Sequence, residues 1–159
     1  MAIAILDYEA GNLTSVELAV RQVGGEPLVT RDPTDVARAE RVIFPGVGSA
    51  ASCMANFKRF GLDQALREAL AAGKPVLAIC IGLQLIFESS AEDDGVECLG
   101  ILPGMVERFE FSGETRVKVP HMGWNEVRIE RPHPLLAGFP DGGECYFVHS
   151  YRPAKVPDE

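Results

Sequence analysis

Short apolar segments alternate with helical patterns over the first ninety residues, and this alternation limits the possible folds more than any other feature. Repeated strand–helix–strand units are typical of a parallel sheet that is covered by helices on both faces. The sequence therefore predicts an α/β fold here. The expected strands are Ala2–Leu6, Pro27–Thr30, Arg41–Phe44 and Val76–Ile79. The expected helices run from Leu13 to Val23, from Asp32 to Ala39, from Ser49 to Ala72 with an interruption near Gly61, and from Cys80 to about Ser90.

The chain changes character after Gly95, where short strand-like runs are separated by turn residues. This pattern favours antiparallel pairing. We expect one domain over residues 1–159, a mainly parallel three-layer α/β fold with an antiparallel, β-rich second half. The runs concerned are Met105–Phe111, Arg116–Val119, Trp124–Ile129 and Cys145–Tyr151.

Charge and composition exclude several classes of function. The formal net charge of −8 argues against a nucleic-acid-binding protein, which needs a basic surface. No apolar run is long enough to cross a bilayer, and the N-terminus has no signal-peptide pattern, so a cytoplasmic protein without membrane contact is expected. None of the four cysteines lies in a C-x-x-C pair, so no metal site is predicted.

Cys80 stands where an apolar strand runs directly into a helical pattern. A corner of this kind projects the side chain and exposes the N–H of the next residue, Ile81, as a donor to an oxyanion. The start of a helix also favours the thiolate form of a cysteine. Gly82 supplies a small residue where the turn is crowded. These features indicate a nucleophile elbow, but by themselves they leave a buried structural cysteine equally open.

A glycine-containing loop, Pro45–Gly48, follows the third strand and supplies a possible complement to Cys80. Ligands bind at the carboxyl ends of strands in open α/β sheets, and both features lie at such ends. Gly46 and Gly48 allow close approach of the backbone, and the N–H of Val47 or Gly48 is a candidate second oxyanion donor. A plain turn is the alternative, and a phosphate-binding loop is a weaker one because its motif is absent.

Several separate segments together resemble the class I glutamine amidotransferases. Among these, the chain is similar to the glutaminase subunits of imidazole glycerol phosphate synthase. The elbow marks only the wider family, whereas the segments around Trp124 and His149 indicate this subunit. The matching segments are Asp7–Leu13, Pro45–Gly48, Ile79–Glu88, Pro120–Asn125 and Tyr146–Tyr151, in the order of the family.

The resemblance implies a reaction and a partner. Cys80 would attack the side-chain amide of glutamine, form a γ-glutamyl thioester and release ammonia and then glutamate. The ammonia would pass to a (β/α)₈-barrel cyclase subunit, bound as a heterodimer, which makes imidazole glycerol phosphate and an aminoimidazole carboxamide ribotide in histidine biosynthesis. No cofactor is implied.

The resemblance also implies roles for individual residues. Gly46, Val47 and Gly48 match the oxyanion strand. The remaining positions match residues that line the glutamine pocket, namely Gly82, Gln84, Glu92, Ser150 and Tyr151, or that lie near the partner, namely Asn12, Trp124 and Asn125. The alternatives are ordinary ones: a helix-surface residue for Gln84, a solvated acidic loop for Glu92, a strand end for Ser150 and Tyr151, and core packing for Trp124.

The sequence departs from the family in three places. Ala78 and Glu9 stand where glycine is common. The family's catalytic His and Glu lie in a late His-Pro-Glu segment, and the chain ends at Glu159 before it. We assign none of the three histidines as the base. A truncated copy of a normal enzyme is therefore expected, with a natural short form as the alternative, and lowered stability is expected because a sheet edge would be exposed.

Two other functions stay open at this point. An inactive remnant that binds the cyclase would explain the missing His and Glu. Another cysteine hydrolase of similar fold, such as the glutaminase of a different amidotransferase, is the second alternative, although the Asp7–Leu13 and His121–Asn125 segments argue against it.

Overall fold

The computed structural model describes residues 2–111 and 118–154. Its internal contacts divide the chain into two compact units. The first unit comprises Met1–Glu107 with Pro153–Glu159, and the second comprises Arg108–Arg152. The single domain expected over residues 1–159 remains a prediction.

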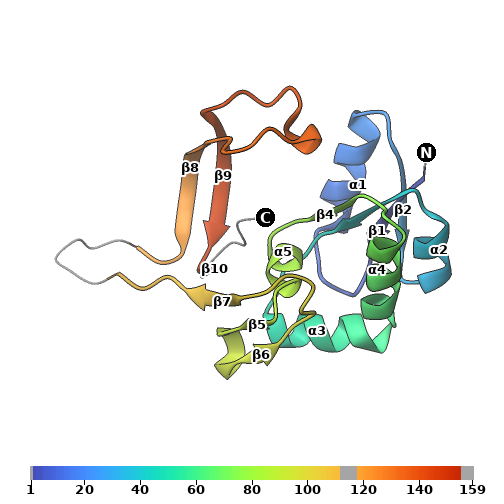
Figure 1. Cartoon of the computed structure of the whole chain (residues 1–159), viewed down its shortest axis with the longest axis horizontal. Helices are drawn as coiled ribbons and strands as arrows, with labels where there is room; N and C mark the ends of the chain where they lie inside the picture. The colour runs from blue at the N-terminus through green and yellow to red at the C-terminus, as the bar shows by residue number, and fades with distance from the viewer. Residues whose placement is uncertain (1, 112–117, 155–159) are drawn as a thin grey trace. The chain divides into compact units, whose positions relative to one another are not determined.

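A four-stranded parallel sheet forms the centre of the first unit (Figure 1). Its order is β2-β1-β3-β4, and each pairing in it is parallel. The α/β fold expected from the alternating pattern is therefore confirmed. The strands are β1 (Ala2–Leu6), β2 (Glu26–Thr30), β3 (Arg41–Phe44) and β4 (Val76–Ala78).

Helices cover both faces of this sheet, as the apolar strands require. Successive side chains of a strand point to opposite faces. Ile5 and Ile43 accordingly pack with Val20 of α1, whereas Leu6 and Phe44 join a larger core with the other helices. The helices are α1 (Leu13–Gln22), α2 (Pro33–Arg38), α3 (Ala50–Arg59), α4 (Leu62–Ala71) and α5 (Ile81–Leu85).

Local signals in the sequence explain where these helices begin and end. The Asp32 side chain accepts a hydrogen bond from the Thr34 N–H and caps α2, with Pro33 in the first turn. Gly61, at φ 67°, separates α3 from α4, which is the interruption expected there. Asn12 precedes α1, but its side-chain oxygen accepts a hydrogen bond from the Ser15 hydroxyl and caps no backbone N–H of the helix.

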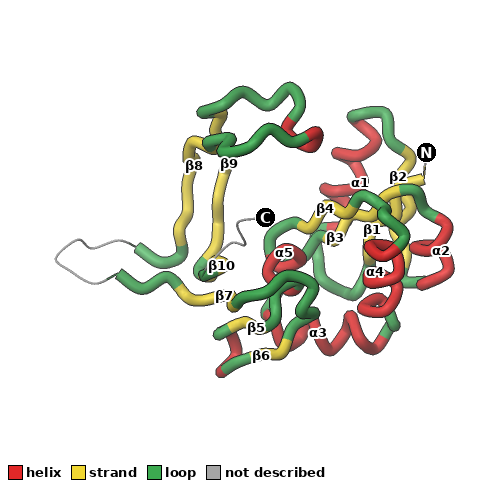
Figure 2. The backbone as a smooth tube through the Cα atoms, in the orientation of Figure 1, coloured by secondary structure: helices red, strands yellow, loops and turns green. Residues whose placement is uncertain are grey.

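The segment after α5 differs from the expected long helix. The helix ends at Leu85, and the chain continues as short elements joined by loops (Figure 2). Backbone N–H groups of Cys98, Leu99 and Gly100 return to carbonyls of residues 85–88 and hold this segment. The elements are β5 (Ser89–Ser90), a 3₁₀ turn η1 (Glu92–Asp94), β6 (Val96–Glu97) and β7 (Met105–Arg108). β5 pairs antiparallel with β6 but parallel with β7.

A long antiparallel hairpin dominates the second unit and confirms the pairing expected for this half. It joins β8 (His121–Val127) to β9 (Gly143–His149) across the 3₁₀ turn η2 (Pro134–Leu136), and β10 (Tyr151–Pro153) follows. Of the expected strand Arg116–Val119, residues 116 and 117 lie outside the described residues, and residues 118 and 119 are not in a strand.

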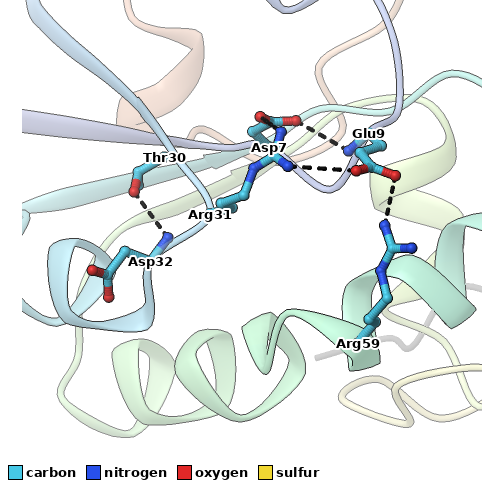
Figure 3. Close-up of polar contacts among 6 residues, drawn as sticks. All are labelled: Asp7, Glu9, Thr30, Arg31, Asp32 and Arg59. Atoms are coloured by element: carbon cyan, nitrogen blue, oxygen red, sulfur yellow. Dashed lines mark hydrogen bonds and ion pairs between the residues drawn. The ribbon is translucent and has the colours of Figure 1, made fainter.

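Two arginines anchor the turn that leaves β1 (Figure 3). Arg31 donates to Asp7 at 2.5 Å and to Glu9 at 3.4 Å, and Arg59 donates to the other carboxylate oxygen of Glu9 at 2.6 Å. Both guanidinium groups lie over the ring of Phe60. Partial burial raises the pKa of Asp7, but the hydrogen bonds from Arg31 and from the Glu9 N–H outweigh it and lower that pKa overall. Glu9 is thus held with its backbone at φ 64°, a conformation that favours glycine.

Substituting Glu9 separates the backbone strain from the ion pairs. Glu9→Ala removes the carboxylate but keeps a Cβ in the left-handed region, whereas Glu9→Gly removes both. We expect Glu9→Gly to be more stable than Glu9→Ala by about 1 kcal/mol in urea unfolding. Equal stability of the two variants would contradict the strain assigned to this turn.

Candidate active site

Cys80 occupies a strained corner between β4 and α5. Its backbone lies at φ 54° and ψ −118°, which a non-glycine residue adopts at a cost of about 1–3 kcal/mol. The corner closes through two hydrogen bonds, from the Gly82 N–H to the Ile79 carbonyl at 3.0 Å and from the Gln84 N–H to the Cys80 carbonyl at 3.1 Å. The residue is exposed. This segment, Ile79–Gly82, has the geometry of the elbow predicted from the sequence.

The end of β3 lies directly against the elbow, and two glycines make this approach possible. The Ile79 N–H donates to the Phe44 carbonyl at 2.9 Å. A Cβ on Gly82 would overlap that same carbonyl oxygen, and a Cβ on Gly46 would overlap the Ile81 side chain and lie 3.0 Å from the Gly82 nitrogen. Gly82 is therefore required at the crowded turn, as expected.

The glycine loop, Pro45–Gly48, passes from the buried end of β3 to the surface beside α3. Pro45 and Gly46 are buried, whereas Val47 and Gly48 are exposed. Gly48 has φ 133°, which disfavours any other residue. The Cys53 thiol lies 3.8 Å from the Val47 carbonyl oxygen. Because the C=O and N–H of one trans peptide point in opposite directions, the Gly48 N–H points away from Cys53.

The first turn of α5 carries the other candidate oxyanion donor. Ile81 is the first residue of this helix, and the N–H groups of a first turn have no acceptor within the helix. Its side chain is buried, which fixes the peptide that carries the N–H. Gln84 is 8% exposed, so it is not the exposed helix-surface residue considered as the alternative.

The acidic run at Glu92–Asp94 caps α3. A carboxylate oxygen of Glu92 accepts from the Ala50 N–H at 2.9 Å, and one of Asp93 accepts from the Ala51 N–H at 3.0 Å. These are free N–H groups of a helix start, where a negative charge is favourable. The run is thus more than the solvated loop considered as its alternative, and Glu92 is tied to the helix that follows the glycine loop.

Burial distinguishes Cys80 from two of the other cysteines. Cys53 and Cys98 are both buried, and burial raises the pKa of Cys53 and raises that of Cys98 to about 11. Thiols of this kind are poor nucleophiles near neutral pH.

The remaining candidate residues lie on other parts of the chain. Asn12 is exposed before α1 in the first unit. In the second unit, the Trp124 side chain on the hairpin is 66% exposed, so it does not pack in a core of that unit. Its ring makes an edge-to-face contact with the ring of Tyr146. The Asn125 side-chain oxygen lies 2.8 Å from His121 Nε2. The Ser150 carbonyl accepts from the Phe109 N–H, and the Tyr151 carbonyl is 2.9 Å from His149 Nδ1.

A family model described as glutamine amidotransferase class-I matches residues 4–159. The chain belongs to the class I glutamine amidotransferase family. Curated relatives agree with this membership and are named imidazole glycerol phosphate synthase subunit HisH. The protein of Nitrosococcus oceani is 47% identical over 99% of this chain and 75% of its own length. The protein of Moorella thermoacetica is 49% identical over 94% of this chain and 69% of its own length. The protein of Chromobacterium violaceum is 48% identical over 96% of this chain and 74% of its own length.

Solved structures support the fold of this amidotransferase. One structure is described as a glutamine amidotransferase. The match covers 98% of this chain and 75% of the chain in that structure, with a TM-score of 0.68 and 17% sequence identity. Another, described as a GMP synthase protein of Thermoplasma acidophilum, matches 99% of the chain and 69% of its own with a TM-score of 0.67 at 17% identity. At such identities the likeness concerns the fold alone.

The described part of the amidotransferase contains neither a candidate metal site nor a candidate membrane span. Within residues 2–111 and 118–154, no cluster of His, Cys, Asp and Glu has the arrangement of a metal site. In the same ranges, no helix has both the length and the apolar character that a membrane span needs.

Sequence reasoning missed two residues that the structure brings to this region. Asp93 has no role assigned from the sequence, but it has φ 53° and its carboxylate caps α3. Tyr8 was noted only as part of a matching segment, yet its buried hydroxyl donates to the Pro45 carbonyl. The available signal was the position of Tyr8, two residues after the end of β1 at the ligand-binding edge of the sheet.

Adding a single methyl group tests the contact between β3 and the elbow. A glycine-to-alanine change inside a helix normally adds about 1 kcal/mol of stability. At Gly82 the new methyl would meet a backbone oxygen that cannot move aside, so we expect a loss of about 2–3 kcal/mol in urea unfolding. Gly11→Ala, where a Cβ meets nothing within 4 Å, is the matched control and should change stability little. A stable Gly82→Ala variant would argue against the close approach.

Proposed function

We propose that this chain is the glutaminase subunit of an imidazole glycerol phosphate synthase and that Cys80 is its nucleophile. The observation that carries the proposal is the strained Cys80 backbone, at φ 54° and ψ −118°, exposed beside the glycine loop. Strain of this kind persists where the surrounding structure enforces it and is frequent at active sites. Membership in the class I amidotransferase family supports the same chemistry.

The reaction proceeds through a covalent intermediate on Cys80. The thiolate attacks the side-chain amide carbon of glutamine, a C–S bond forms, and the carbonyl oxygen becomes an oxyanion. When the carbonyl re-forms, the C–N bond breaks and the nitrogen takes up a proton and leaves as ammonia. Water then attacks the thioester, the C–S bond breaks, and glutamate and the Cys80 thiol are released.

Backbone N–H groups stabilise the oxyanion in this proposal. The N–H of Ile81 follows the nucleophile directly, and the N–H of Val47 or Gly48 supplies a donor from the glycine loop. Removal of one such donor typically slows an acyl-transfer enzyme by about 10²–10³-fold. Gly46 and Gly82 serve by allowing the loop and the elbow to approach each other.

Residues for glutamine recognition are assigned by their match to the family's motifs. Gln84 lines the pocket from α5, and Glu92 faces the substrate's α-amino group with the carboxylate oxygen that does not cap α3. The family resemblance also assigns Ser150 and Tyr151 to glutamine binding through their backbone groups. A base must also accept the proton of the thiol, and none of His121, His133 and His149 is assigned to this role. The ring nitrogens of His121 and His149 already lie 3.0 Å apart.

The partner is a (β/α)₈-barrel cyclase subunit, which uses the ammonia. Names of the relatives at 46–49% identity describe a subunit of a synthase, and this supports a heterodimer. Asn12, Trp124 and Asn125 are assigned to its interface, and the exposure of Trp124 supports that assignment. A cytoplasmic location is part of the proposal, in keeping with free thiols at all four cysteines.

Replacing the nucleophile tests the proposal in the complex with the cyclase. We expect Cys80→Ala to lower the rate of glutamate release by at least about 10³-fold, because the covalent route is lost. Cys98→Ala, which removes a buried thiol elsewhere in the first unit, should keep most of the activity. Unchanged turnover in Cys80→Ala would refute the assignment, and a wild-type chain that binds the cyclase without Cys80-dependent hydrolysis would identify an inactive binding subunit instead.

A further inference from the structure

We infer that Tyr8 is a positioning residue of the glutaminase site, whose hydroxyl holds the glycine loop against the elbow. The inference rests on the proposed function, since it concerns the oxyanion donors of the same reaction. Tyr8 does not belong to the residues assigned to chemistry or to glutamine binding. It reaches the site from the carboxyl end of β1.

The location of Tyr8 gives its side chain almost no freedom. It is fully buried, and its ring meets Phe44 and Phe57 edge-on at centroid distances of 5.5 and 5.2 Å. Phe44 is the last residue of β3, so the ring of Tyr8 packs against the residue from which the glycine loop departs. Aromatic contacts of this kind fix the direction of the phenol oxygen.

The hydroxyl of Tyr8 acts on the first peptide of the glycine loop. It donates to the Pro45 carbonyl oxygen at 2.5 Å. A Cβ on Gly46 would overlap both this hydroxyl and the Ile81 side chain, so Gly46 lies between Tyr8 and the elbow. The loop is thus held from one side by Tyr8 and from the other by the residue that follows Cys80. Val47 and Gly48, the candidate oxyanion donors, come directly after this fixed peptide.

Both chain neighbours of Tyr8 are anchored as well. Arg31 binds Asp7, and Arg31 and Arg59 together bind Glu9 (Figure 3). Burial raises the pKa of Tyr8 well above its usual range, so the hydroxyl stays protonated and can donate near neutral pH. The turn after β1 therefore presents one fixed donor to the loop.

The quantity that changes, the folding equilibrium or the reaction rate, separates a merely structural role from a positioning role. Without the Tyr8 hydroxyl the buried Pro45 carbonyl loses this donor, and an unsatisfied buried acceptor lowers the ratio of folded to unfolded protein by about five- to 150-fold. Misplacement of an oxyanion donor acts on the reaction rate, where a whole donor accounts for about 10²–10³-fold. A merely structural role would change only this ratio, whereas a positioning role would also lower kcat in the complex that remains folded.

The test is Tyr8→Phe in the complex with the cyclase, with Thr30→Val as the matched control. Thr30 also carries a buried hydroxyl that hydrogen-bonds in the first unit, to Asp35 at 2.7 Å. We expect kcat for glutamate release to fall at least about ten-fold in Tyr8→Phe, with KM within about three-fold and the rate of Cys80 alkylation by iodoacetamide unchanged, since alkylation forms no oxyanion. Thr30→Val should leave all three values near those of the wild type.

A second measurement does not depend on turnover. We expect the amide NMR resonances of Gly46, Val47 and Gly48 to shift in Tyr8→Phe and to stay in place in Thr30→Val. Unshifted resonances in Tyr8→Phe, a kcat within two-fold of the wild type, or an equal loss of kcat in Thr30→Val would each overturn the inference. A wild-type complex without Cys80-dependent hydrolysis would instead refute the proposed function. The amide resonances would still show whether the Tyr8 hydroxyl holds the glycine loop in place.

Discussion

The contact between the end of β3 and the corner at Cys80 is the constraint on which the candidate site depends. The Phe44 carbonyl oxygen accepts a hydrogen bond from the Ile79 N–H, and the same oxygen leaves no room for a side chain at residue 82. Gly46, in the loop that follows β3, likewise lies so close to Ile81 and Gly82 that it leaves no room for a side chain. The parallel sheet sets these two strand ends side by side, and the two glycines allow the loop to close over the corner.

The strain at Cys80 follows from this arrangement. Side chains of β3, β4 and α5 pack in one core, so the short connection from β4 to α5 must turn sharply, and Cys80 takes up this turn at φ 54°. Part of the folding free energy is thereby used to hold an exposed thiol in one orientation. The cap that Glu92 and Asp93 place on α3 ties a candidate substrate-binding residue to the same framework.

Local patterns predicted the sheet and most helices, whereas contacts distant in sequence were not predictable. The four parallel strands follow from apolar runs, and the α2 cap follows from Asp32 and Pro33. The early end of α5 depends on hydrogen bonds to Cys98–Gly100, and the capping of α3 by Glu92 and Asp93 spans 42 residues, so neither has a local signal. The corner at Cys80 was predictable because its signal is local, while the hydrogen bond of Tyr8 joins it to a residue 37 positions away.

A rapid acid quench of the complex with the cyclase during glutamine turnover, followed by peptide mass spectrometry, tests the central claim most directly. The account predicts one γ-glutamyl group in thioester linkage on the peptide that contains Cys80, formed and lost at rates that match glutamate release. Glutamate release without this adduct during turnover would contradict the assignment of Cys80 as the nucleophile. A γ-glutamyl adduct on Cys53, Cys98 or Cys145 instead would also contradict it.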